Sequence, residues 1–139
     1  MRQALGQLEV EAPRQGLHEI TGQIAAWLAE QQIREGLLTL FLRHTSASLL
    51  IQENADPDVL RDLEDFLAKL APEDNAPYRH VAEGPDDMPA HLKGALTQSH
   101  LAVPVREGTL QLGTWQGIFL FEHRRRPRRR QLALHLAGV

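Results

Sequence analysis

The run Leu37–Leu42 constrains the fold more than any other stretch of this 139-residue chain. It is an unbroken series of branched and aromatic apolar residues with one threonine, which is typical of a strand covered on both faces at the centre of a sheet. Polar residues begin abruptly at His44, which strand alternation places on the same face as Leu40 and Leu42. A histidine at the end of a core-facing row is either a hydrogen-bonded core residue or the wall of a pocket. The polar residues that follow it favour a pocket.

The composition is that of one ordinary globular domain over residues 1–139. Apolar residues make up 42% and charged residues 24% of the chain, and no apolar stretch is long enough for a membrane span. The first residues lack the apolar core of a signal peptide, so we expect a cytoplasmic protein. The chain has no cysteine, which excludes disulfides, thiolate metal sites and cysteine nucleophiles.

Periodicity predicts the elements of the first half of the chain. Alternation over Leu8–Ala12 predicts a strand with one solvent-facing side. Apolar residues at helical spacing over Leu17–Leu28 predict an amphipathic helix. Asp56-Pro57 is a strong helix start, with Asp as N-cap and Pro at the first helical position. That helix has an apolar face that includes Phe66 and ends before Pro72.

The second half predicts a short helix and several antiparallel strands. Residues 72–89 form a polar connection, and the helix follows over Pro89–Thr97. Leu101–Arg106 and Thr109–Leu112 read as a hairpin, Trp115–Glu122 as the next strand and residues 132–136 as the last. We therefore predict an α+β fold: a single domain with a large mixed or mostly antiparallel β-sheet, two to three helices and a C-terminal antiparallel meander.

Six arginines occupy seven positions over Arg124–Arg130, although the net charge of the chain is −3. This cluster could contact nucleic acid or phosphorylated small molecules, or it could be a solvated hairpin tip. No aromatic residue is interleaved with the arginines, and the acidic remainder of the chain would repel a polyanion, so nucleic acid is disfavoured. We expect a solvated loop, with phosphate contact as the next alternative.

Seven histidines are many for a chain of this length. His44, His80 and His91 lie beside carboxylates or structural breaks and could converge on a divalent cation, with Glu53 or Asp56 as an oxygen ligand. Their spacing matches no local metal motif, so separate hydrogen-bonded or solvated histidines are the alternative. We expect structural or solvated roles for the others, His18, His100, His123 and His135.

Two further patterns favour structural interpretations. Ser46 and Ser48 lack the G-x-S-x-G surroundings of an acyl-transfer nucleophile. Gly113 and Gly117 could present backbone amides to a phosphate, but they lack the Lys and the helix start of a P-loop. Tight strand packing is the favoured interpretation of the two glycines.

Three stretches taken together resemble a known family. They are His44–Ser48 followed by Glu53–Asp58, the segment Gly84–Lys93, and the Gly-Thr-Trp-Gln-Gly sequence at 113–117. This combination resembles the YjbQ-like family, sometimes called secondary thiamine-phosphate synthases, over about residues 20–138. The resemblance implies an α+β fold, assembly as a homotrimer and a polar pocket near a subunit boundary.

The resemblance also implies an activity. Family members are credited with weak thiamine-phosphate formation, which joins a pyrimidine methyl diphosphate to a thiazole phosphate and releases pyrophosphate. The alternative is a non-catalytic trimeric module that binds a metal or an anionic metabolite. We expect the partners to be other copies of the chain and a phosphorylated small molecule, with nucleic acid disfavoured and no membrane.

Site residues follow by position from the same resemblance. His80 and His91, with His44 beside them, would bind zinc or magnesium or donate protons. Asp87 stands where some members have Asn, which adds a metal-ligating oxygen and removes an amide donor. The catalytic set implied is His44, His80, Asp87, His91 and Lys93, and the substrate-binding set is Glu53, Asn54, Asp56, Thr114, Trp115 and Gln116.

Overall fold

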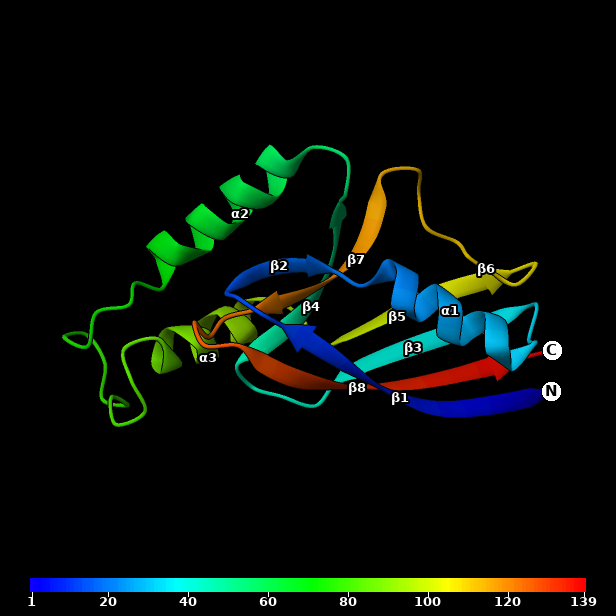
Figure 1. The fold of residues 1–139 in the computed structure, drawn as a ribbon, viewed down its shortest axis with the longest axis horizontal. Helices are drawn as coiled ribbons and strands as arrows, with labels where there is room; N and C mark the ends of the chain where they lie inside the picture. The colour runs from blue at the N-terminus through cyan, green and yellow to red at the C-terminus, as the bar shows by residue number, and fades with distance from the viewer.

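The computed structural model describes residues 1–139 as three helices and eight strands (Figure 1). In chain order the elements are β1 Arg2–Ala12, β2 Gly16–Glu19, α1 Thr21–Gln31, β3 Gly36–Leu42, β4 Ala47–Glu53, α2 Pro57–Leu70, α3 Asp87–Leu96, β5 His100–Arg106, β6 Thr109–Leu110, β7 Gln116–Glu122 and β8 Arg128–Gly138. None of the three helices combines the length and the apolar character needed to cross a bilayer.

The strands form two sheets in which every paired strand is antiparallel. The larger sheet has the order β1-β8-β3-β5-β6 and the smaller has the order β2-β7-β4. The predicted α+β fold is confirmed. The C-terminal strands are divided between the two sheets, because β7 pairs with β2 and β4 whereas β8 lies between β1 and β3.

The main core lies between the inner face of the larger sheet, helix α1 and the smaller sheet. It contains Leu38 and Leu40 of β3, Ile24 of α1, and Leu49 and Ile118 of the smaller sheet. All five side chains are fully buried. The strand β3 is central, as predicted.

The expectation that Leu37–Leu42 is covered on both faces is wrong for the single chain. Leu37 and Phe41 are 47% and 50% exposed on the outer face of the larger sheet. The reason is that α1 and the smaller sheet both pack on the inner face, so no element is left to cover the outer one.

The helix predictions hold for α2 and need a shift for α1. Asp56 caps α2 as predicted, and its Oδ1 accepts a hydrogen bond from the backbone N–H of Asp58 at 2.9 Å. Leu17 lies in β2 and pairs with β7, so α1 begins only at Thr21. Phe66, on the predicted apolar face of α2, is 59% exposed, because α2 packs on the smaller sheet along a narrow strip around Leu67.

The chain changes sheets at the bend that joins β3 to β4, residues 43–46. This bend is fixed to β8, since the backbone N–H of Gln131 donates to His44 Nε2 at 2.7 Å. Through this bend the chain crosses from the larger sheet, which contains β3, into the smaller sheet, which contains β4.

A buried ion pair joins the end of β7 to the start of β8. Glu122 is 0% and Arg130 4% exposed, and Arg130 Nε donates to Glu122 Oε1 at 2.6 Å. Arg130 Nη2 also donates to Ser46 Oγ at 3.0 Å, so the same pair holds the 43–46 bend. Arg130 is thus an internal anchor of the arginine cluster and not part of a solvated loop.

We predict that Arg130→Met lowers the free energy of unfolding by about 3–5 kcal/mol, because it leaves the Glu122 carboxylate buried without its partner. Urea unfolding measures this loss. The matched control is Arg129→Met, whose side chain is 68% exposed and pairs with Glu11 on the surface, and which should cost less than about 1 kcal/mol. Adding Glu122→Gln to Arg130→Met should recover part of the loss. Equal losses in the two single arginine variants would contradict this account of the pair.

Candidate functional site

Three potential metal ligands converge at the N-terminal end of α3. His80 Nε2 and His91 Nε2 lie 2.6 Å and 3.2 Å from the same atom, Asp87 Oδ2. The ligand atoms of the three residues are all within 4.8 Å of one another. The Asp87 side chain is only 3% exposed, whereas those of His80 and His91 are 43% and 35% exposed and can meet a ligand from solvent. We call His80, Asp87 and His91 the three-donor set.

Local sequence explains how these side chains meet. Asp87 and His91 are four residues apart on α3, so they lie on one face of the helix. Gly84 has φ +103°, a conformation that favours glycine, and its carbonyl accepts from the backbone N–H of Asp87 at 3.3 Å. This turn brings the connection before α3 back over the helix, which places His80 beside Asp87.

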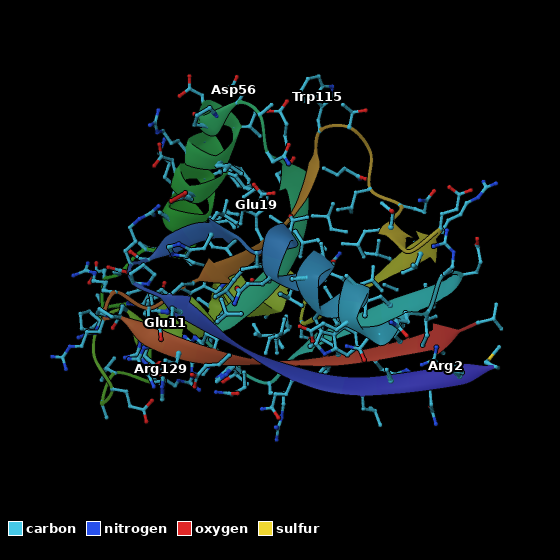
Figure 2. The ribbon with its side chains drawn as sticks, turned by 45° about the vertical axis from the view of Figure 1, so that its right-hand side comes forward. Arg2, Glu11, Glu19, Asp56, Trp115 and Arg129 are labelled. Atoms are coloured by element: carbon cyan, nitrogen blue, oxygen red, sulfur yellow. The ribbon has the colours of Figure 1, made fainter.

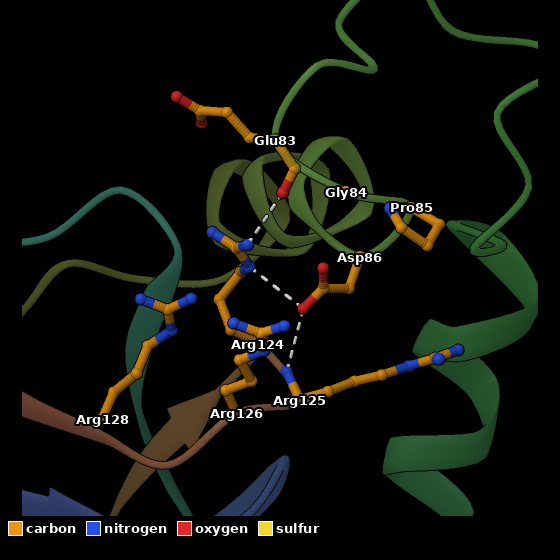
Figure 3. A pocket seen from close by; sticks show the side chains of 8 residues that line it. All are labelled: Glu83, Gly84, Pro85, Asp86, Arg124, Arg125, Arg126 and Arg128. Carbon is orange, nitrogen blue, oxygen red and sulfur yellow. Dashed lines mark hydrogen bonds and ion pairs between the residues drawn. The ribbon is translucent and has the colours of Figure 1, made fainter.

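Arg124 holds the three-donor set from the opposite side. Its Nη1 donates to Asp87 Oδ1 at 2.6 Å. Its Nε donates to Asp86 Oδ2 at 3.0 Å, and its Nη2 donates to the carbonyl of Glu83 at 3.1 Å (Figure 3). The side chain is only 15% exposed, so Arg124, like Arg130, departs from the expected solvated loop. Sequence reasoning missed this role because the contact spans 37 residues.

The charge state of Asp87 follows from these contacts. Burial by itself would raise the pKa of Asp87, but the hydrogen bond to His80 and the positive charge of Arg124 outweigh it and lower the pKa below its usual value. The carboxylate is therefore ionised at neutral pH, which is the state that ligates a cation. Arg124 responds in the opposite sense: burial would lower its pKa, but the hydrogen bond to Asp86 and the nearby carboxylates raise it.

The geometry suits a divalent ion. Ligand atoms about 2.0–2.2 Å from a zinc-like ion are separated by about 2.8–3.6 Å in octahedral or tetrahedral arrangements. The separation of 3.2 Å between His91 and Asp87 is already in this range, and that of 2.6 Å between His80 and Asp87 needs to open by a few tenths of an ångström. Two histidines and one carboxylate also form a proton-donating set when no ion is bound.

His44 lies beside the three-donor set but not within it. It lines a pocket of about 330 Å³ that it shares with His91, Gly94 and Ser99. Its Nε2 is occupied by the N–H of Gln131. Burial and the charge of Arg130 lower its pKa, which favours the neutral imidazole. The structure thus brings together four of the five predicted catalytic residues, with His44 as a pocket wall.

Lys93 belongs to a different pocket. It is 6% exposed and lines a pocket of about 180 Å³ with Gly16, Glu64 and Phe121. Burial lowers the pKa of Lys93, and the nearby Glu73 opposes this shift. Arg125 lowers the pKa of Lys93 further and Asp86 raises it, so Lys93 lies near charged groups beside the three-donor set although it lines another pocket.

The predicted substrate-binding residues lie at the far end of β4 and β7. Ala47 pairs with Glu122 at the end of β4 nearer the three-donor set, and Glu53 pairs with Gln116 at the other end. Seven residues of strand separate the two ends by about 20 Å. Figure 2 shows Asp56 and Trp115 together at this remote end. Within one chain, the two predicted sets are therefore apart.

Several of the predicted substrate-binding residues form hydrogen bonds that fix the local structure at this end of β4 and β7. Glu53 Oε2 accepts from the backbone N–H of Asp56 at 3.0 Å, and the N–H of Asn54 donates to the carbonyl of Trp115 at 2.9 Å. Gln116 Oε1 accepts from the N–H of Gly113 at 2.7 Å. Thr114 is exposed, and Trp115 is 62% exposed, so the indole neither packs in the core nor walls a pocket of this chain.

A buried serine–histidine pair also emerges that the sequence did not reveal. His123 Nε2 lies 2.9 Å from Ser48 Oγ, which is 2.6 Å from Thr97 Oγ1. Thr97 Oγ1 donates to the carbonyl of Lys93 at 2.7 Å, so Ser48 donates to Thr97 and His123 donates to Ser48. Burial lowers the pKa of His123 to about 3. Ser48 is 1% exposed, which agrees with the expectation that it is not an acyl-transfer nucleophile.

Comparisons with known proteins agree on one family. The family model described as UPF0047 protein YjbQ-like matches residues 6–139. The chain is 51% identical to the UPF0047 protein sll1880 of Synechocystis sp., over 94% of this chain and 89% of the relative. It is 44% identical to the UPF0047 protein YjbQ of Escherichia coli O157:H7, over 94% and 95%.

Solved structures give the same result. The conserved hypothetical protein TT1486 of Thermus thermophilus superposes with a TM-score of 0.85 at 41% identity, over 95% of this chain and 99% of that one. The hypothetical protein APE1520 of Aeropyrum pernix superposes with a TM-score of 0.87 at 28% identity, over 98% and 99%. The chain therefore belongs to the UPF0047, or YjbQ-like, protein family.

Proposed function

We propose that this protein is a small-molecule enzyme that binds a divalent metal ion at the three-donor set and acts on a phosphorylated heteroaromatic substrate. The observation that carries the proposal is the convergence of two imidazole nitrogens on one oxygen of Asp87. The other oxygen of that carboxylate is held by Arg124. A buried carboxylate that is fixed in this way is oriented before any ligand arrives.

The reaction class comes from the resemblance to YjbQ-like proteins. In thiamine-phosphate formation the bond between the pyrimidine methylene carbon and its diphosphate oxygen breaks. The thiazole nitrogen forms the new bond to that carbon, and pyrophosphate leaves. A cation supplies charge stabilisation for a leaving pyrophosphate. His80 and His91 would hold such a cation or protonate a leaving oxygen, and Arg124 would keep Asp87 ionised beside them.

The second candidate function is a non-catalytic module that binds a metal ion or an anionic metabolite. The position of the predicted substrate-binding residues at the far end of β4, a strand about 20 Å long, favours it, because one chain then lacks a complete active site. This candidate predicts saturable binding without turnover. For either function we place the protein in the cytoplasm, where phosphorylated metabolites are available.

We predict that tag-free protein purified without chelator carries about one divalent ion per chain, and that the ion is lost from a His80→Ala/His91→Ala variant. Elemental analysis measures the ion content. His91→Ala should also lower thiamine-phosphate formation by about a hundredfold or more. The matched control is His18→Ala, in which the ring removed binds the carbonyl of Arg14.

The outcomes separate the two candidates. Metal binding without turnover would favour the binding module. Protein that takes up no zinc, magnesium or manganese would contradict the metal ligand assignment, and turnover unchanged by His91→Ala would contradict the catalytic one.

We also propose that the chain assembles as a homotrimer through the outer face of the larger sheet. An antiparallel sheet with one solvated face normally carries polar residues there. Here Leu5, Leu37 and Phe41 are 79%, 47% and 50% exposed. Phe41 and His44 line the same pocket, so this face runs up to the neighbourhood of the three-donor set. A closed assembly would cover the face and could bring the remote residues of one copy toward another.

We predict that light scattering gives wild-type protein a mass three times the 15.6 kDa of the chain. Phe41→Lys should lower the mass toward that of a monomer, because a charge would then be buried between copies. Leu70→Lys is the control, since Leu70 is 56% exposed on α2, away from this face. A wild-type monomer, or a Phe41→Lys variant that keeps its full mass, would contradict the proposal.

A further inference from the structure

An arginine-rich pocket lies directly beside the three-donor set. We call it the arginine pocket; it has a volume of about 350 Å³ and is open to solvent (Figure 3). Four arginines from the β7–β8 connection and the start of β8 face the segment before α3. The lining residues are Glu83, Gly84, Pro85, Asp86, Arg124, Arg125, Arg126 and Arg128.

Two of the four arginines are neutralised by the protein itself. Arg124 is committed to Asp86 and Asp87. Arg125 pairs with Glu73, and Figure 3 shows its side chain extending away from the other three toward α2. The carboxylate of Asp86 accepts from Arg124 and from the backbone N–H of Arg125. The carboxylate of Asp86 is therefore matched by these two arginines, and that of Glu83 lies 3.6 Å from His80 Nε2.

The other two arginines keep their charges free. Arg126 and Arg128 form no ion pair with any carboxylate of the chain. Arg128 is partly buried, and its Nε is shielded from solvent without a hydrogen-bond acceptor. A buried donor without a partner is costly, and native structures normally supply one. The terminal N–H groups of this guanidinium also have no acceptor within the chain, and Arg128 lines the pocket, where a bound ligand can supply one.

We propose that the arginine pocket binds the phosphate or diphosphate group of the substrate. Guanidinium groups present planar pairs of N–H donors that match the oxygens of phosphate, and they stay charged at all physiological pH values. Arg126 and Arg128 both line the pocket and supply the uncompensated charge.

The position of the pocket gives the phosphate group a role. Arg124 lines the pocket and also bonds to Asp87, so a phosphate held there lies next to the three-donor set. A diphosphate could then contact arginines at one end and a metal-bound position at the other. In this respect the inference rests on the proposed function and names the subsite that receives the departing pyrophosphate.

The test is calorimetric titration of metal-free protein with inorganic phosphate and with pyrophosphate at low salt. We expect wild-type protein to bind pyrophosphate more tightly than phosphate. An Arg126→Gln/Arg128→Gln variant should weaken binding about tenfold or more, since it removes two charged donors. The matched control is Arg129→Gln, which removes the same charge from the same strand but from a side chain paired with Glu11 (Figure 2). It should change affinity less than about twofold.

Two further variants separate the loss of phosphate binding from misfolding and from loss of the metal site. Arg126→Gln alone changes an exposed side chain that forms no hydrogen bond or ion pair within the chain, so we expect it to lower affinity without lowering stability. A His80→Ala/His91→Ala variant should retain binding of inorganic phosphate, which separates the subsite from the metal site. Equal binding by the Arg126→Gln/Arg128→Gln variant and by Arg129→Gln, or no binding by wild-type protein, would overturn the inference even if the metal ion is present.

Discussion

The buried ion pair between Glu122 and Arg130 is the interaction on which the candidate site depends. Glu122 accepts two donors of Arg130 and, through Oε2, the backbone N–H of Arg124 at 3.0 Å. That contact fixes the start of the β7–β8 connection, so the side chain of Arg124 can reach Asp87. Asp87 in turn aligns the two histidines of the three-donor set. The positions of the site residues thus depend on the buried ion pair in the sheet, and Arg124 connects that pair to Asp87.

The arginines of the β7–β8 connection and the start of β8 have two different roles, because only some of them pair with carboxylates of the chain. Arg124 and Arg130 are committed to internal carboxylates, where they stabilise the arrangement of the chain. Arg126 and Arg128 lie between them in sequence and have no such partner. A run that looks like one basic segment is therefore divided into anchors and free charges. The free charges of Arg126 and Arg128 therefore lie beside the three-donor set, which can hold a cation. The two arginines and the cation would both bind a diphosphate.

Sequence reasoning succeeded where the information is local and failed where a distant partner decides. Asp56-Pro57 predicted the start of α2, and the apolar run after Gly36 predicted the central strand. The outer face of that strand and the exposure of Phe66 depend on which elements pack nearby, which periodicity does not encode. The spacing of Asp87 and His91 is readable from the chain. The contact between Asp87 and Arg124 could not be predicted from the sequence, because a run of arginines does not indicate which distant carboxylate each one pairs with.

Anomalous diffraction tests most directly whether the three-donor set is a metal centre. Crystals grown with zinc or manganese should show one strong anomalous peak about 2.0–2.2 Å from His80 Nε2, His91 Nε2 and Asp87 Oδ2. The contact between His80 and Asp87, now 2.6 Å, should lengthen as the ion enters. A map without a peak between these atoms, with the hydrogen bonds unchanged, would contradict the metal assignment and leave the cluster as an acid–base or structural group.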